Sequence, residues 1–331
     1  MSKLELTIAT WNYDRVQPLI DGRVTIEGCA INYLPMSVEE CFQRAYLHDE
    51  FDIVELGFSP FLIARSRDMA RYEAIPVFLS RMFRHSAIYI RTDRGIERPE
   101  DLRGRRVGVP EFQMSAALWA RGMIQDDHGV RPDEMTWVQG GLEVPGRREK
   151  FPLNLPEGFP LEPVPAGKTL TGMLKSGELD AIFTARAPSC FEEGAPHVGR
   201  LYPDYKAAEA EYFRRTGVFP IMHALGIRTA LVEEHPWLPA SVYKAFVQAK
   251  QIAEREMREV AALKYTLPWL AADLAHTEAV MGRDYWTYGI GANRKALELM
   301  FRYSFEQGLA VRQLSIEDVF VSSTLDDDIH V

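Results

Sequence analysis

The sequence is poor in cysteine. Only Cys29, Cys41 and Cys190 occur among its 331 residues, and no two of them form a CxxC pair. An odd number of scattered cysteines argues against a disulfide framework and against a zinc site built on cysteine. We therefore expect all three to be buried small hydrophobic residues.

The sequence also lacks a basic excess and a long apolar run. Its net charge is −9 at pH 7, and no basic stretch interrupts it, which argues against a nucleic-acid partner. No run of 18 apolar residues occurs, so we expect no membrane-spanning helix. The first ten residues, MSKLELTIAT, lack the apolar region of a secretory signal, so we expect a cytoplasmic protein.

Several catalytic motifs are missing as well. The chain contains no G-x-S-x-G, no Walker A loop, no G-x-G-x-x-G and no H-E-x-x-H. These absences argue against a hydrolase with a nucleophile elbow, an NTPase, a nucleotide-dependent oxidoreductase and a zinc protease. We expect neither an organic cofactor nor a metal. A divalent ion held by His and Glu from distant loops stays open, because spacing in the sequence does not reveal such a site.

What the sequence does contain is a regular alternation of strand and helix patterns. Residues 4–9, 30–34 and 51–56 have strand character, and Ser37-Val-Glu-Glu40 is a capping box that opens a helix. Strands separated by helices of this size indicate βαβ units and a largely parallel sheet. A chain of 331 residues is long enough for two such domains.

A second lobe is expected from about residue 94, with a strand at 105–109 and a helix from about 115 to 127. Residues 140–167 hold six of the 20 prolines and no periodicity, which is typical of a functional or mobile segment. We predict an α/β fold of two lobes, 1–93 plus 222–331 and 94–221. The hinge crossings are expected at 92–95 and 218–222, and the ligand is expected in the cleft between the lobes.

Two segments resemble a known superfamily. Leu174-Lys-Ser-Gly-Glu-Leu-Asp-Ala-Ile-Phe183 and Asp101-Leu-Arg-Gly-Arg-Arg-Val-Gly108 are similar to recurring segments of type II periplasmic binding proteins. The resemblance implies a fold of the venus-flytrap type, in which two lobes close on a small molecule.

Further motifs, spread over nearly the whole chain, resemble the 4,5-dihydroxyphthalate decarboxylase family. They include Tyr13-Asp-Arg15, Pro76 to His85, Gly108-Val-Pro-Glu111, Pro145-Gly-Arg-Arg-Glu149, Ala185-Arg-Ala-Pro188 and Phe219-Pro-Ile-Met-His223. The resemblance implies an intracellular lyase of aromatic compound catabolism and phthalate degradation. Such an enzyme releases carbon dioxide from a dihydroxylated benzene dicarboxylate to give protocatechuate, without an organic cofactor.

Arginines are the candidates for substrate binding. Arg81 and Arg84 lie in one motif and Arg186 in another, and a guanidinium matches a carboxylate with two parallel hydrogen bonds. A cation on the departing carboxylate would stabilise the ground state, so we assign this clamp to the carboxylate that stays. The departing one is expected to face apolar side chains such as Phe112. The alternative is that these arginines pair with surface acids.

The loop after the first strand is a second candidate region, because ligands of open α/β sheets bind beyond the carboxyl ends of the strands. Trp11 or Tyr13 is expected to stack on an aromatic ring, and Asp14 or Arg15 to meet its polar edge. Ser59 follows the third strand and, together with Glu55, is expected to support the site.

Proton transfer is assigned to His85, His223 and Glu111. Imidazole titrates near neutrality, so either histidine can protonate the ring carbon, while Glu111 is a candidate base for the phenol. The alternative for His223 is a hydrogen-bonded core residue, and for Glu111 a helix cap.

Two other functions compete with the decarboxylase. A binding protein or sensor for a small aromatic carboxylate would need the same clamp and no proton donor. An enzyme of the thiamine-pyrimidine-synthase type would need a cysteine-rich iron motif, which three scattered cysteines do not supply. The expected partner is a small aromatic carboxylate, without nucleic acid or membrane, and a homo-oligomer stays open.

Overall fold

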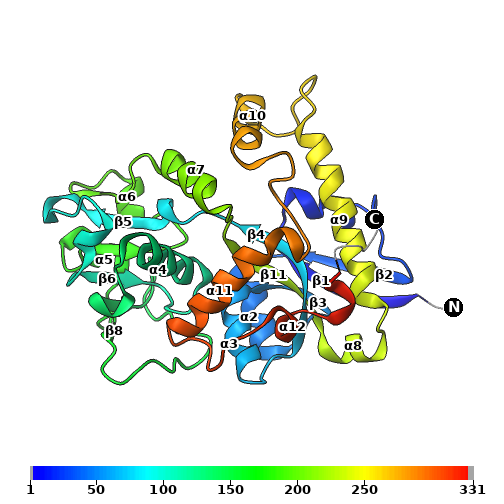
Figure 1. The fold of residues 1–331 in the computed structure, drawn as a ribbon, viewed down its shortest axis with the longest axis horizontal. Coiled ribbons are helices and arrows are strands. Elements are labelled where there is room, and N and C mark those ends of the chain that lie inside the picture. Colours follow the sequence, from blue (N-terminus) through cyan, green and yellow to red (C-terminus); the bar gives the residue numbers. More distant parts are fainter. Residues whose placement is uncertain (1–2, 327–331) are drawn as a thin grey trace.

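A computed structural model describes residues 3–326 and divides them between two lobes, each built on one sheet (Figure 1). The first sheet has the order β2-β1-β3-β11-β4. Its strands are β1 (Leu4–Thr10), β2 (Cys29–Pro35), β3 (Ile53–Gly57), β4 (Tyr72–Arg81) and β11 (Ile221–Arg228). The predicted strands at 4–9, 30–34 and 51–56 are thus confirmed.

The second sheet has the order β10-β5-β9-β6-β7-β8. Its strands are β5 (Ile88–Arg91), β6 (Arg106–Val109), β7 (Thr136–Gln139), β8 (Leu161–Pro163), β9 (Ala181–Phe183) and β10 (Val198–Arg200). Strands β9, β6, β7 and β8 are parallel to one another, whereas β5 is antiparallel to both β9 and β10.

Helices cover both sheets. The first lobe holds α1 (Gln17–Ile20), α2 (Val38–His48), α3 (Phe58–Ser66), α8 (Thr229–Glu234) and α9 (Leu238–Met257). The second holds α4 (Ser115–His128), α5 (Leu170–Ser176), α6 (Ser189–Glu192) and α7 (Tyr205–Thr216). The chain ends with α10 (Leu270–Met281), α11 (Arg294–Glu306) and α12 (Ile316–Val319).

The local signals that begin these helices are visible in the sequence. The Ser37 side chain accepts a hydrogen bond from the Glu40 amide, which satisfies one of the free N–H groups at the start of α2. Helix α4 ends at Gly129, whose φ of 66° lies in the left-handed region that glycine adopts without strain.

The first crossing between lobes differs from the prediction. It lies between the end of β4 at Arg81 and the start of β5 at Ile88, earlier than the predicted 92–95. Residues 88–91 are buried on both faces, so their pattern predicts a strand without showing which sheet it joins. The return lies between Thr216 and Ile221, which overlaps the predicted 218–222.

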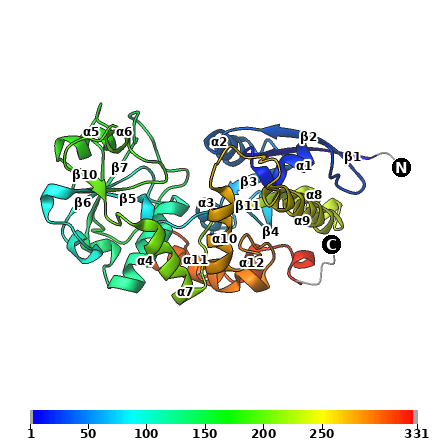
Figure 2. The ribbon, with the colours of Figure 1, turned by 90° about the horizontal axis from the view of Figure 1, so that it is seen from above.

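The register of the first sheet brings four strand ends together. His223 at the start of β11 pairs with Gly57 at the end of β3, and Ile221 pairs with Arg81 at the end of β4. Because β1 is parallel to β3, its carboxyl end lies at the same edge. This edge faces the second lobe (Figure 2).

The lobes share apolar packing at the hinge. One cluster of buried residues extends through both sheets, and Trp119 of α4 donates from its indole to the Ile221 carbonyl at 2.8 Å. Helix α11 lies behind this contact, where Tyr303 donates to Asp126 at 2.6 Å. A large apolar contact limits the relative motion of two domains.

Two predictions from the sequence concern its cysteines and membrane-spanning helices. Cys29, Cys41 and Cys190 are all free and buried, as predicted. Among residues 3–326, no helix is both long enough and apolar enough to span a bilayer.

Candidate active site

A cavity of about 220 Å³ lies between the lobes and is lined by both of them. Its charged and titratable residues are Glu39, Arg84, Glu111, Arg147, Lys150, Arg186 and His223, and its apolar residues include Val38, Phe42, Pro60, Met114, Ala116 and Met222. A hollow of about 470 Å³ adjoins it and shares Glu39, Met114, Arg147 and Arg186. A hollow of about 430 Å³ beside Tyr46 and Phe151 contains none of the predicted site residues. We take the 220 Å³ cavity as the candidate site and call it the pocket.

Arg84 is the most unusual group in the pocket. Its side chain is buried in the crossing segment, and Nε donates to the Met222 sulfur at 3.1 Å while Nη1 is 3.7 Å from the Met82 sulfur. Burial lowers the pKa of Arg84 to about 10, so the group is still charged at neutral pH. Thioether sulfur is a weak acceptor, and no carboxylate among the described residues forms an ion pair with Arg84. A buried cation without an oxygen acceptor is suited to bind an anion.

His223 is held in the pocket by a buried carboxylate. Its Nδ1 is 2.6 Å from Glu55 Oε1, and its ring meets the edge of Phe42 at 4.8 Å. Glu55 also accepts from the Trp11 amide at 2.8 Å and from the Tyr13 hydroxyl at 2.6 Å. Burial by itself would raise the pKa of Glu55, but the hydrogen bond and charge of His223, with Trp11 and Tyr13, hold it below its usual value. This carboxylate fixes the ring and leaves Nε2 as the nitrogen available for chemistry.

Glu111 occupies the opposite side of the pocket, after β6. Its carboxylate is almost fully buried and lies 2.6 Å from Arg147 Nη2 and 2.5 Å from Lys150 Nζ. Both cations belong to the proline-rich stretch 140–167. They make this side of the pocket a place where negative charge can be stabilised.

Glu149 holds the two cations in place. Its carboxylate accepts from the amides of Phe112 and Gln113, just before α4, and burial raises its pKa. Arg147 and Lys150 lie close to Glu149 in the chain. The hydrogen bonds from the two amides to the Glu149 carboxylate therefore hold both cationic side chains near Glu111.

Arg186 closes the pocket toward the adjoining hollow. Its guanidinium lies 2.8 Å from the Glu39 carboxylate on α2, so the ion pair joins the two lobes. Both side chains are partly exposed, unlike Arg84.

Two predicted residues lie behind the pocket rather than in its lining. Arg81 donates to Asn293 Oδ1 at 2.7 Å, to the Phe219 carbonyl at 2.7 Å and to both oxygens of Thr287. His85 is buried between the rings of Tyr202 and Tyr212, and burial lowers its pKa to about 4. Neither is among the residues that line the pocket.

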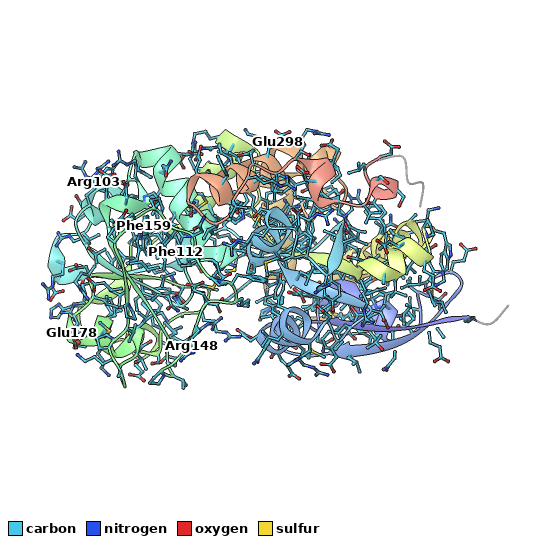
Figure 3. All side chains as sticks on the ribbon, turned by 90° about the horizontal axis from the view of Figure 1, so that it is seen from below. Arg103, Phe112, Arg148, Phe159, Glu178 and Glu298 are labelled. Atoms are coloured by element: carbon cyan, nitrogen blue, oxygen red, sulfur yellow. The ribbon has the colours of Figure 1, made fainter. Side chains whose placement is uncertain are left out.

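The remaining predicted residues also lie outside the lining. Phe112 and Phe159 lie side by side within the second lobe, as Figure 3 shows, and Arg121 stacks on Phe112 at 3.7 Å. Arg15 lies between the rings of Tyr13 and Trp286 and forms an ion pair with Asp14. The buried Ser59 donates from its amide to Ser115 Oγ, which lines the pocket.

Comparisons with known proteins show the family to which the chain belongs. A family model described as NMT1/THI5 like matches residues 70–145. A 4,5-dihydroxyphthalate decarboxylase of Comamonas testosteroni is 42% identical over 326 residues, which cover 98% of this chain and 99% of that protein. Another, of Pseudomonas putida, is 47% identical over 65% of this chain and 83% of that protein. The chain belongs to the 4,5-dihydroxyphthalate decarboxylase family.

Solved structures show the fold of this family member. A sulfonate-binding protein from Methylobacillus flagellatus matches at a TM-score of 0.56, with 13% identity over 98% of this chain and 93% of that protein. One from Escherichia coli matches at a TM-score of 0.53, with 13% identity over 98% of this chain and 99% of that protein. At this identity the match shows the fold alone. It confirms the predicted type II periplasmic-binding-protein architecture.

Sequence reasoning missed Arg147, Lys150 and Glu149 as site residues. Two signals pointed to them: Arg147 and Glu149 stand in the family-like motif Pro145 to Glu149, and all three lie in the aperiodic stretch 140–167. A segment without helix or strand periodicity does not indicate which way its side chains point. The contacts of this stretch with Glu111 and with the amides of residues 112 and 113 could therefore not be predicted.

Proposed function

We propose that this protein decarboxylates a hydroxylated aromatic dicarboxylate such as 4,5-dihydroxyphthalate, giving protocatechuate. The observation that carries the proposal is that two groups line the same pocket. One is the buried guanidinium of Arg84, which has no oxygen acceptor among residues 3–326, and the other is the imidazole of His223, which a carboxylate orients. The names of the two relatives supply the substrate class.

The polarity of the pocket suits this substrate. Arg84 contacts Met222, the residue before His223, so the anion site and the imidazole lie close together. The two carboxylates of the substrate are neighbours on the ring, so one can bind Arg84 while the other stands beside His223. The hydroxyl groups at the far edge then point toward Glu111, Arg147 and Lys150. Phe42 and Met114 provide an apolar wall, which disfavours a carboxylate more than the neutral carbon dioxide it becomes.

The reaction needs one base and one acid. Glu111 takes the proton of the hydroxyl para to the departing carboxylate, and the two cations stabilise the phenolate. The electrons move to the ring carbon that bears this carboxylate, and His223 donates its Nε2 proton there. The carbon–carbon bond then breaks, its electron pair restores the aromatic ring, and carbon dioxide leaves. Glu111 returns its proton to the product, and His223 regains one from water.

We propose that neither an organic cofactor nor a metal takes part, since the deprotonated ring itself carries the electrons through the reaction. We also propose that the protein acts in the cytoplasm, in phthalate degradation. The three unpaired cysteines are compatible with a reducing compartment.

The decisive experiment combines purified protein with 4,5-dihydroxyphthalate in heavy water. We expect carbon dioxide and a protocatechuate with one deuterium at the carbon that lost its carboxylate. The residue-level control is His223→Asn, which should bind the substrate and release little carbon dioxide. If the wild-type protein binds the acid and releases none, the function is that of a binding protein.

A further inference from the structure

Residues 260–281, which include α10, form an arm that projects from the body. Figure 1 shows α10 at the top of the view, above β4 and away from both sheets. None of these 22 residues is buried, although α10 lies alongside α7. The segment therefore has well-formed helical structure without an interior of its own.

The arm is nonetheless apolar. Of the thirteen large hydrophobic side chains exposed among the described residues, four lie here: Val260, Leu263, Leu267 and Trp269, the last 74% exposed. Eight of the twelve residues of α10 are Ala, Leu, Val or Met. A helix with so little polar surface is normally buried, and one of this length is marginal alone in water. The arm therefore has the composition of a segment that is normally buried against other protein.

The few charged side chains of the arm all form ion pairs within the chain. Lys264 pairs with Glu256, Asp273 lies 2.8 Å from Lys206, and Glu278 lies 2.8 Å from Arg258. These are the only Lys, Arg, Asp or Glu residues in the arm. A partner that recognises the arm through charge would find no free group to pair with.

We infer that the arm binds the arm of a second copy of this chain. The chain carries a net charge of −9, so two copies repel each other over most of their surface. The arm carries one lysine and two carboxylates, all paired, so repulsion is weakest there. An uncharged apolar surface is best matched by another, and a two-fold axis supplies one from the same chain. A membrane surface fits less well, because interfacial helices are rich in Lys and Arg.

The first test is the mass of the full-length protein in solution. At micromolar concentration we expect sedimentation or light scattering to give at least twice the 37.7 kDa of the chain. Leu267→Glu combined with Trp269→Glu should return the mass to that of one chain, with an unchanged circular dichroism spectrum. The matched control, Leu47→Glu with Val311→Glu, introduces the same charges at exposed apolar sites elsewhere and should keep the wild-type mass.

A second test does not depend on the folding of charged variants. Ala275 is exposed on α10, and the three native cysteines are buried. Under mild oxidation Ala275→Cys should form a covalent dimer, and Val311→Cys should not. A wild-type mass of one chain, or an assembly that survives the arm charges without this crosslink, would overturn the inference. A third result would also overturn it: a protein with the mass of one chain that floats with anionic vesicles, when the Leu267→Glu and Trp269→Glu variant does not float. That result would make the arm a membrane-binding element.

Discussion

The pocket and the hinge core behind it, by which we mean Arg81, His85 and the residues around them, each contain one buried arginine and one histidine, and the two sets differ in what surrounds them. In the pocket, Arg84 has thioether neighbours and His223 a carboxylate. In the hinge core, Arg81 has four oxygen acceptors and His85 two aromatic rings.

The arginines show the difference between a buried guanidinium that has oxygen acceptors and one that has none among the described residues. Arg81 ties β4 to the hinge carbonyl of Phe219 and to the segment before α11, so its hydrogen bonds hold three parts of the chain together. Arg84 has no oxygen acceptor within the described part of the chain, and it lines the pocket. Since buried polar groups are normally satisfied, the guanidinium that meets only sulfur marks the place where a ligand supplies oxygen acceptors.

The histidines differ in their electrostatics. Burial holds His85 neutral, and its Nδ1 has no hydrogen-bond partner within the described structure. The Nδ1 of His223 is hydrogen-bonded to the Glu55 carboxylate, which orients the ring. Only His223 is both oriented by a carboxylate and part of the pocket lining, so it is the histidine placed to transfer a proton to the substrate.

The largest effect that separates the two regions should come from the histidines. His223→Asn should lower kcat by about 10²- to 10⁴-fold, because a positioned acid contributes that much, and should leave KM within a few-fold. His85→Asn should leave kcat unchanged. Steady-state kinetics on both variants measure the difference, and equal losses would mean that both histidines act through folding.

The second effect is a pH dependence of stability confined to the hinge core. The pKa of His85 is about 4 in the fold against about 6.5 when unfolded, because burial disfavours the charged ring; Asp127, His128 and Arg215 add smaller effects. The neutral ring is therefore favoured in the fold. Its contribution is complete above pH 6.5 and is lost as the pH falls to 4, by roughly 3 kcal/mol.

The measurement is urea unfolding of wild type and His85→Phe between pH 7 and pH 4. The difference between the two stability curves isolates the histidine from the carboxylates that both proteins share. We expect the wild type to lose more stability in this range. A constant difference would show that His85 is charged in the fold or solvated there.

The third effect distinguishes the two arginines. Arg84→Ala should raise KM by about 10- to 150-fold, since a charged hydrogen bond contributes about 1.5–3 kcal/mol, with little change in the free energy of unfolding. Arg81→Ala should do the reverse, because the acceptors it leaves unpaired cost about 1–3 kcal/mol of stability. Calorimetric titration with substrate and thermal unfolding separate these outcomes. A loss of affinity in Arg81→Ala alone would reverse the assignment.

The sequence predicts much of the fold because its signals are local. Strand alternation, the capping box at Ser37 and the glycine that ends α4 all depend on neighbours along the chain. The sheet that β5 joins depends on pairing with β9, some ninety residues away, and nothing in the four residues 88–91 encodes that choice.

The site was harder to predict, for a related reason. Arg81, Arg84 and His85 stand within five residues in one family-like motif, and sequence reasoning gave them all to the pocket. The chain leaves β4 and crosses between lobes at this point, so residues three and four apart point in different directions. Whether an arginine meets oxygen or sulfur is decided by residues such as Asn293 and Met222, which only the folded chain brings near.

The smallest effect concerns Arg186, the exposed arginine of the pocket. It tests whether Arg186 binds the substrate as the buried Arg84 is proposed to do. Glu39→Gln removes the ion pair that occupies Arg186, and exposed pairs contribute about 0.2–1 kcal/mol, so KM should fall by no more than about 5-fold. The gain should shrink in high salt, because solvent-exposed charges are screened. The matched control is Glu298→Gln, which removes a similarly exposed partner of Arg294 on α11 and should leave KM unchanged. If Glu39→Gln instead raises KM as strongly as Arg84→Ala, then Glu39 itself contacts the substrate, and the ion pair across the lobes is part of the binding site rather than its competitor.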